Sequence, residues 1–291
     1  MNGKLVPRAM WASLQVVSTG FSLAAVVCWG VSDFTGGYAS KRSDAFLVTL
    51  LAHSSGFLLM GGLALATHAP LPDRASQLWA MLAGALGGTA LAIFYRTLAA
   101  GNMGLIAPVS AVLAAGIPTG FAMITEGVPG AITTTGFLLA GLGIWLVSRP
   151  EDGMGKPEGL WMAVIAGFGF AGFFIFIHRT GDTSAVWAAA HSRVGSLIVV
   201  GLIVLLRPGK HRVEWRDAAL GLFAGCLDST GTLFFIRAEQ TGRLDAAVVI
   251  SSLYPAITVL MARLFLREHF TRWKAAGIVA ALVAVPLIAL Q

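Results

Sequence analysis

The chain reads AGALGGTALAIFYRTLAAG over residues 83–101 and AGCLDSTGTLFFIRAEQTG over residues 224–242. At the same spacing, both stretches contain an opening Ala-Gly pair, a leucine, a threonine, an arginine and a closing glycine. Beyond the loop that follows, a one-residue adjustment aligns Glu126 with Glu268. A recurrence of this length indicates that the chain holds two copies of one structural unit.

Around this repeated stretch, each half of the chain contains five long apolar runs. A helix crosses a bilayer core with about 20 apolar residues. We expect spans at residues 18–39, 45–67, 77–98, 103–125, 130–148, 158–178, 184–206, 217–237, 244–265 and 274–290. Five is an odd number, so the two copies take opposite orientations, as in the inverted repeats of secondary transporters. The sequence therefore predicts an all-α polytopic membrane protein with ten transmembrane helices arranged as two inverted five-helix repeats.

The most polar linker marks the boundary between the two copies. We expect a first repeat at residues 1–148, a linker at 149–157 and a second repeat at 158–291. The linkers between spans are short and leave no room for a further domain. Small residues four apart allow helix backbones to approach closely in a membrane. Three such pairs are Gly84/Gly88, Gly116/Gly120 and Gly221/Gly225.

Composition supports a membrane protein. Hydrophobic residues make up 56% of the chain and charged residues 12%, against a usual charged fraction of about 25%. The net charge is +6, but Lys and Arg are spread singly through loops, which fits topology anchors better than a nucleic-acid surface. They are more numerous on the side opposite the termini, which favours termini outside. We expect a multi-pass protein of the inner cell membrane with no nucleic-acid partner.

Three segments carry a resemblance to a known family. AVVCWGVSDF at Ala25–Phe34 looks like a first-helix pattern, and FYRTLA at Phe94–Ala99 with APVS at Ala107–Ser110 is similar to a junction between third and fourth helices. Pro255, 13 residues before Glu268, resembles the ending of a ninth helix. Together these segments resemble the EamA family of the drug/metabolite transporter superfamily. The resemblance implies two EamA-like repeats, a ten-helix bundle, a central cavity and alternating access for amino acids, nucleosides, drugs or other metabolites.

The two copies depart from each other at positions that matter for specificity. Leu113 stands in the first copy where Pro255 stands in the second, and Phe168 stands where Trp29 would recur. Asp228 lies opposite Gly87. Shared positions argue for the fold, and we expect substrate specificity to lie in the unshared ones.

Ionisable groups inside the predicted spans are candidates for function, because such groups are expensive in a bilayer. Asp228 lies near the middle of the eighth span and Arg193 near the middle of the seventh. Asp228 would bind a cationic substrate group or cycle a proton, since burial favours the protonated carboxyl. The alternative is a structural ion pair between Asp228 and Arg193, and Arg193 would equally suit recognition of a carboxylate.

Asp33 follows Trp29 by four residues, so the two lie on one face of the first helix. A tryptophan beside a carboxylate suits an amphipathic or cationic ligand. Asp33 is also a candidate for proton coupling. The alternative is that Asp33 lies at an early helix end, because Gly36-Gly37 would interrupt the span there.

His53 and His191 share the local string Ala-His-Ser, which suggests equivalent positions in the two repeats. Histidine titrates near neutral pH and relays protons, so both are candidate substrate or proton sites. A hydrogen-bonded core role is the alternative. Arg193 follows His191 by two residues and points about 200° away around the helix, so the two do not both face a central cavity.

Aromatic residues and prolines complete the candidate site. Tyr95 and Tyr254 are expected to contact substrate, although Tyr95 would equally serve as an interfacial anchor. Pro108, Pro118 and Pro255 are expected to kink their helices and act in gating, because each frees a backbone carbonyl.

The chain holds no recognisable enzyme or nucleotide-binding motif. We expect no cofactor and no metal, and transport driven by an ion or substrate gradient. The function predicted is secondary active export of a small amphipathic metabolite, such as an amino acid, a nucleobase, a nucleoside or a drug-like compound, with proton coupling as one candidate driving force. The alternative is an intramembrane enzyme that uses buried His and Asp for lipid or acyl transfer. A monomer or a homodimer is expected.

Overall fold

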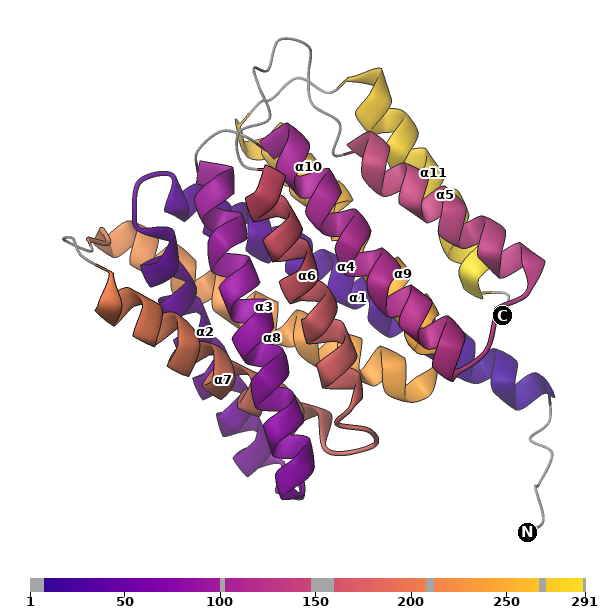
Figure 1. Cartoon of the computed structure of the whole chain (residues 1–291), viewed down its shortest axis with the longest axis horizontal. Coiled ribbons are helices and arrows are strands. Elements are labelled where there is room, and N and C mark those ends of the chain that lie inside the picture. The colour runs from indigo at the N-terminus through magenta and orange to yellow at the C-terminus, as the bar shows by residue number, and fades with distance from the viewer. Residues whose placement is uncertain (1–7, 100–102, 148–159, 208–211, 267–270, 290–291) are drawn as a thin grey trace.

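The computed structural model describes residues 8–99, 103–147, 160–207, 212–266 and 271–289, and within these ranges it forms a bundle of helices without strands (Figure 1). For residues 8–13, 98–99, 103–109 and 160 it describes the backbone alone. The helices are α1 (Arg8–Ser40), α2 (Ala45–Ala66), α3 (Arg74–Ala99), α4 (Met103–Thr125), α5 (Ala131–Val147), α6 (Leu160–His178), α7 (Ala185–Leu206), α8 (Trp215–Thr241), α9 (Leu244–Ser251), α10 (Tyr254–Leu266) and α11 (Arg272–Ala289).

The protein is an all-α, multi-pass membrane protein. Eight segments of the described chain are long and apolar enough to cross a membrane, with α9 and α10 counted together as one of them. Two shorter apolar helices, Ser110–Thr125 and Ala131–Val147, bring the described set to the ten predicted helices. The ends of most helices lie within a few residues of the predicted spans. The first helix is the exception, since α1 begins at Arg8 rather than at residue 18.

The ninth span is broken. α9 ends at Ser251, Ser252 and Leu253 form a turn, and α10 restarts at Tyr254. Pro255 explains the break, because proline lacks the amide hydrogen that a continuous helix needs and its ring clashes with the preceding turn. As the second residue of α10, Pro255 lies where neither defect is costly.

α1, in contrast, runs unbroken through Gly36 and Gly37 to Ser40. The alternative reading of Asp33 as a residue at an early helix end is therefore wrong. Gly36 serves close packing instead, since a Cβ there would overlap the ring of Tyr95.

Glycines bring four helices into backbone contact. A Cβ on Gly225 of α8 would overlap the carbonyl oxygen of Ala52 on α2, and a Cβ on Gly84 of α3 would overlap that of Ser192 on α7. The predicted pairs Gly84/Gly88 and Gly221/Gly225 thus lie in helix interfaces. The third pair, Gly116/Gly120 on α4, does not, because no described atom lies within 4 Å of a Cβ built at either position.

These contacts correct one equivalence inferred from the sequence. Gly225 and Gly84 match in the repeat, and they pack on Ala52 and Ser192, so Ala52 and Ser192 are counterparts. The residues that follow these two, His53 and Arg193, are then counterparts as well. The shared Ala-His-Ser string, which paired His53 with His191, is offset by two residues from this structural match.

The contacts between helices of the two halves have counterparts when the halves are exchanged. α1 packs on α8 as α6 packs on α3, α2 packs on α8 as α7 packs on α3, and α4 packs on α6 as α9 and α10 pack on α1. α5 and α11 pack on each other at one edge of the bundle (Figure 1). A duplicated unit produces this pattern, although the division into inverted repeats stays a prediction. The linker 149–157 and Glu268 lie outside the described residues.

Candidate functional site

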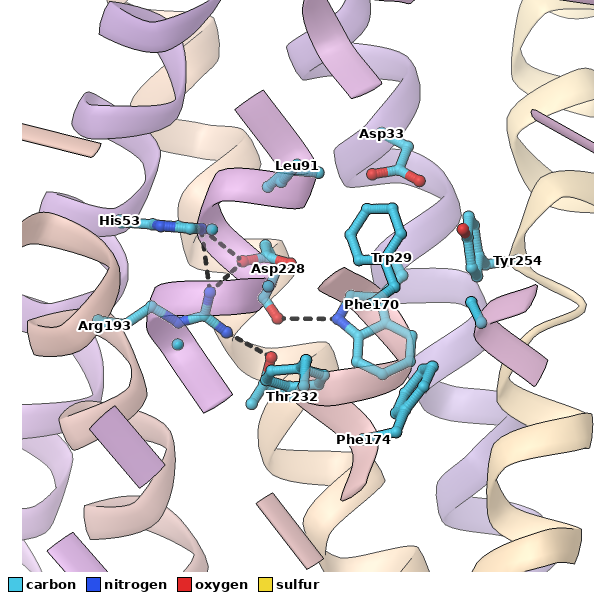
Figure 2. Close-up of a pocket in the computed structure, with 15 residues that line it drawn as sticks. Trp29, Asp33, His53, Leu91, Phe170, Phe174, Arg193, Asp228, Thr232 and Tyr254 are labelled. Atoms are coloured by element: carbon cyan, nitrogen blue, oxygen red, sulfur yellow. Dashed lines mark hydrogen bonds and ion pairs between the residues drawn. The ribbon is translucent and has the colours of Figure 1, made fainter. Parts of the chain in front are cut away.

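A cavity lies at the centre of the bundle and draws its walls from both halves of the chain (Figure 2). The empty space of the cavity and its open mouth together is about 580 Å³. Six of its lining residues are candidate site residues from the sequence: Trp29, Asp33, His53, Arg193, Asp228 and Tyr254. The other lining residues are Gly84, Gly87, Gly88, Leu91, Ala114, Phe170, Phe173, Phe174 and Thr232.

Arg193 and Asp228 form an ion pair on one side of this cavity (Figure 2). Nη1 of Arg193 donates to Oδ2 of Asp228 at 2.6 Å, and its Nη2 donates to the hydroxyl of Thr232. Arg193 is buried, with 4% of its surface exposed. The structure thus contains the pair that the sequence left as an alternative, and both charges are engaged without a ligand.

His53 joins this pair from α2. Its Nε2 lies 3.1 Å from Nη1 of Arg193 and 3.4 Å from Oδ2 of Asp228. Its Nδ1 contacts the hydroxyl of Ser196. His53 therefore links α2, α7 and α8 as a buried hydrogen-bonding bridge.

Trp29 forms the opposite wall of the cavity. Its Nε1 donates to the backbone oxygen of Asp228 at 3.1 Å, which fixes the plane of the indole. The ring centroid lies 5.9 Å from that of Phe174 and 6.3 Å from that of Tyr254, the latter edge to face. A Cβ on Gly231 would overlap the indole. The close approach of α8 to Trp29 therefore requires glycine at position 231.

Asp33 lies one helical turn beyond Trp29 and also lines the cavity. Only 8% of the residue is exposed. No hydrogen bond or ion pair to its carboxylate is present among the residues that the structure describes. Figure 2 places it beside Trp29 and Tyr254, apart from the Arg193–Asp228 pair. The cavity therefore has one paired carboxylate and one unpaired carboxylate.

The prolines have different local settings. The break before Pro255 sets Tyr254 at the start of α10, where it lines the cavity. Pro118 is buried within α4, and α4 continues through both Pro118 and Pro108 as one helix. Only the backbone of Pro108 is described. A role in gating stays a prediction for all three.

Tyr95 and His191 do not line the cavity. Tyr95 is fully buried in α3 and donates its hydroxyl hydrogen to the backbone oxygen of Ser32 at 3.3 Å, so it is not an interfacial anchor. The Nδ1 atom of His191 lies 2.9 Å from the backbone oxygen of Trp187, one turn earlier on the same helix. Arg193 occupies the cavity face of α7, and the angular offset between the two residues turns His191 away from it.

Sequence reasoning missed the aromatic wall contributed by α6. Phe170, Phe173 and Phe174 are spaced at i, i+3 and i+4, which places them on one helix face. This spacing was the available signal, but a phenylalanine stripe in an apolar span looks the same whether it faces lipid or a cavity. Thr232, which follows Asp228 by one turn, was missed for a similar reason.

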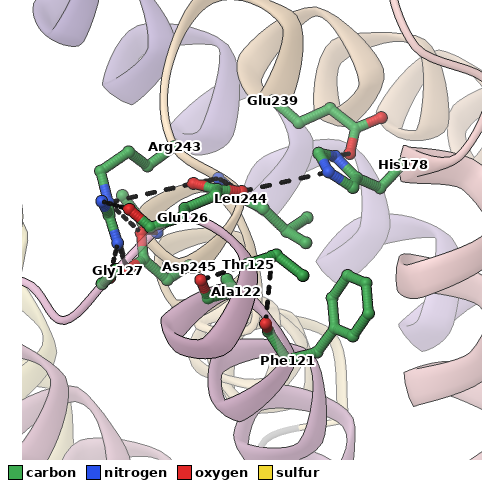
Figure 3. A network of polar contacts seen from close by, with 11 residues as sticks. Phe121, Ala122, Thr125, Glu126, Gly127, His178, Glu239, Arg243, Leu244 and Asp245 are labelled. Carbon is green, nitrogen blue, oxygen red and sulfur yellow. Dashed lines mark hydrogen bonds and ion pairs between the residues drawn. The ribbon is translucent and has the colours of Figure 1, made fainter.

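A second polar network lies where α4, α6 and α8 end and α9 begins (Figure 3). Arg243, in the short connection between α8 and α9, donates to the backbone oxygens of Glu126 and Gly127 at 3.1 and 2.6 Å. It also pairs with the buried Asp245 at 2.7 Å. The end of α4 is thereby tied to the start of α9, and Glu126 takes part in this helix-end contact.

His178 extends this network to α6. Its Nδ1 lies 3.2 Å from Oε2 of Glu239 on α8, and its Nε2 lies 4.0 Å from Oε1 of Glu126. Burial raises the pKa of the Glu126 carboxyl, and the nearby Asp245 carboxylate raises it further. The hydrogen bond to Asp245 raises the pKa of Arg243. Sequence reasoning did not select His178, Glu239 or Asp245, because charges near span ends usually face water.

Comparison with known proteins agrees with the arrangement of helices. Residues 157–290 match the model of the EamA-like transporter family. The match covers most of the second half of the chain. The resemblance inferred from the sequence is confirmed over these residues, and the EamA family is part of the drug/metabolite transporter superfamily.

The fold as a whole has a relative among solved structures. One, described as "Crystal structure of protein", matches with a TM-score of 0.74 over 94% of this chain and 96% of that chain, at 15% sequence identity. This likeness shows a shared fold that extends over both halves. No curated protein matches the chain in sequence.

Proposed function

We propose that the protein is a secondary active transporter that exports a small amphipathic metabolite across the inner cell membrane by alternating access. The observation that carries the proposal is the central cavity, which combines charged groups and aromatic rings at the meeting point of the two halves. A membrane protein with an EamA-like half and such a cavity is built to bind a small polar molecule at mid-membrane depth.

Alternating access needs one end of the cavity to close while the other opens. The network around Arg243 ties the ends of α4, α6, α8 and α9 together at one end of the bundle. We assign to it the closure of that end. The break between α9 and α10 supplies a hinge, because two short helices change their relative angle more easily than one continuous helix.

We assign proton coupling to Asp33 rather than to Asp228. The Asp228 carboxylate pairs with Arg193 at 2.6 Å, and this pairing favours its ionised form over the protonated form. Asp33 has no such partner among the described residues. An unpaired carboxylate in a cavity of low dielectric is stabilised by a proton or by a cation. Exchange between the two would couple a proton gradient to substrate movement.

The enzyme alternative has one feature in its favour. Ser196, His53 and Asp228 form a chain of contacts like that of a hydrolase triad. Ser196, however, is fully buried between α3 and α7 and does not line the cavity. Its hydroxyl contacts the position that a side chain on Gly88 would occupy. With its hydroxyl out of reach of a substrate, this serine serves helix packing, and the geometry favours transport.

The test is counterflow in proteoliposomes with amino acids, purines and organic cations as solutes. We expect wild-type protein to exchange at least one of these solutes, and Asp33→Asn to abolish its dependence on a proton gradient. Asp73→Asn is the matched control, because Asp73 is exposed and caps α3, a role that Asn also fills. Absence of exchange for every solute would contradict the transport proposal. Unchanged proton dependence in Asp33→Asn would contradict the coupling role alone.

A further inference from the structure

We infer that the cavity selects a monovalent organic cation, an ammonium group on an apolar body, with the Asp33 carboxylate as its counter-ion. The inference rests on the proposed function and adds a substrate class to it. It begins with charge. Arg193 and Asp228 compensate each other, which leaves Asp33 as the one carboxylate of the described lining without a cationic partner.

The engagement of Arg193 argues against substrates that carry a carboxylate. Its two terminal nitrogens already donate to Asp228, His53 and Thr232. An anionic or zwitterionic solute would have to displace Asp228 from the guanidinium and leave that carboxylate without its partner. Breaking a buried pair in this way is strongly unfavourable. A cation meets no such obstacle at Asp33.

Aromatic rings surround the place where the cation would sit. Trp29 lies one turn before Asp33 on α1, and Tyr254 packs edge to face on the indole (Figure 2). Phe170, Phe173 and Phe174 line the cavity from α6. The faces of such rings attract ammonium groups, and the same rings offer an apolar surface to the rest of the ligand. A carboxylate beside aromatic rings therefore fits an organic cation.

A metal ion fits this lining poorly. Hard cations take six or more oxygen ligands, whereas the cavity offers one free carboxylate among rings and small residues. Within the described residues, no group of three or more His, Cys, Asp or Glu side chains is placed to hold a metal. The donor set thus favours an ammonium, whose charge is met by one carboxylate and by ring faces.

Protons and the cation would compete for the same carboxylate. The titratable groups that face Asp33 are Asp228 on α8, Tyr95 on α3 and Tyr254 on α10, and none of them supplies a positive charge. Binding of a permanent cation should therefore weaken as pH falls. A neutral solute of the same shape has no charge to compete with the proton, and its binding should not show this dependence.

The experiment is equilibrium binding to the purified full chain in detergent near neutral pH. Four radiolabelled probes share one phenyl body: phenethylamine, phenethyltrimethylammonium, phenylalanine and hydrocinnamate. We expect the two cations to bind at least about tenfold more tightly than the zwitterion and the anion. We also expect Asp33→Asn to lose at least about tenfold in cation affinity, while Asp73→Asn stays at the wild-type value.

Several results would overturn the inference. The first is tighter binding of phenylalanine or hydrocinnamate than of the two cations. The second is a wild-type cation affinity in an Asp33→Asn variant whose unfolding midpoint is also that of the wild type. The third is an affinity for phenethyltrimethylammonium that does not weaken as pH falls. If counterflow moves other solutes while both cations fail to bind, the substrate class is wrong and transport stands. If the cations bind as expected but no solute is exchanged, the site stands and the transport proposal fails.

Discussion

Gly225 illustrates how single residues set the helix positions around the cavity. A Cβ at this position would overlap the backbone of Ala52, which precedes His53 in the chain. The α2–α8 contact therefore depends on the missing side chain, and through it so does the distance between His53 and Asp228. Gly84 plays the same part for α3 and α7, next to Arg193.

We predict that Gly225→Ala destabilises the protein by about 1–3 kcal/mol, the usual cost of overpacking a close contact. The matched control is Gly61→Ala on α2, where a Cβ meets no atom within 4 Å. That change should alter stability by less than about 1 kcal/mol. Thermal unfolding in detergent measures both. Equal unfolding midpoints for the two variants would show that the Gly225 contact does not limit stability.

The charged members of the cavity could be predicted from the sequence, because a charge inside an apolar span stands out. Asp33, His53, Arg193 and Asp228 were all found in this way. Which carboxylate is paired could not be predicted, since that depends on the rotation of α1, α7 and α8 about their axes. Tyr95 was misjudged for the same reason. A tyrosine near a span end has the same sequence signature whether it faces the membrane interface or another helix.

At the scale of helices, the Arg243 network joins elements that are far apart in the chain. Arg243 bridges the α4–α5 connection and the start of α9, and 29% of its side chain is exposed while that of Asp245 is fully buried. Removing the guanidinium takes a positive charge away from a buried carboxylate. Water reaches the arginine side, so the cost is less than for a fully buried pair.

We predict that Arg243→Gln lowers stability by about 1–3 kcal/mol. If the lost ion pair between Arg243 and Asp245 is the cause, Arg243→Gln combined with Asp245→Asn should recover part of that loss. The measurement is the thermal unfolding midpoint of the single variant compared with that of the double variant. A double variant less stable than Arg243→Gln would mean that the network is held by its backbone contacts rather than by charge.

The helices themselves were largely predictable, because an apolar run of fixed length has few alternatives in a membrane. The break of the ninth span follows from Pro255. Pro118 shows the limit of this reasoning, since α4 continues through it. Whether a helix breaks at a proline or continues through it depends on which neighbouring groups hydrogen-bond to the freed carbonyl. A single sequence does not specify those neighbours.

At the scale of the whole molecule, the two halves meet around one cavity, and their helix contacts correspond when the halves are exchanged. The sequence repeat predicted this plan from a few glycines and an arginine. It could not predict that His53 and Arg193 are the counterparts that face the centre. The central claim is that this cavity is exposed in turn to the two sides of the membrane.

The most direct test of that claim is labelling of one cavity cysteine from each side. Cys28 and Cys226 are the cysteines of the chain, so replacing both by Ala allows a single cysteine to be introduced at Ala114, which lines the cavity. Leu58→Cys in the same background is the control, because Leu58 is 71% exposed on the outside of α2, towards lipid. A membrane-impermeant maleimide is added to one side of oriented vesicles at a time.

We expect Ala114→Cys to be labelled from either side and to be protected by phenethylamine, while Leu58→Cys reacts from neither. Labelling of Ala114→Cys from one side alone, whatever solute or gradient is applied, would contradict alternating access through this cavity.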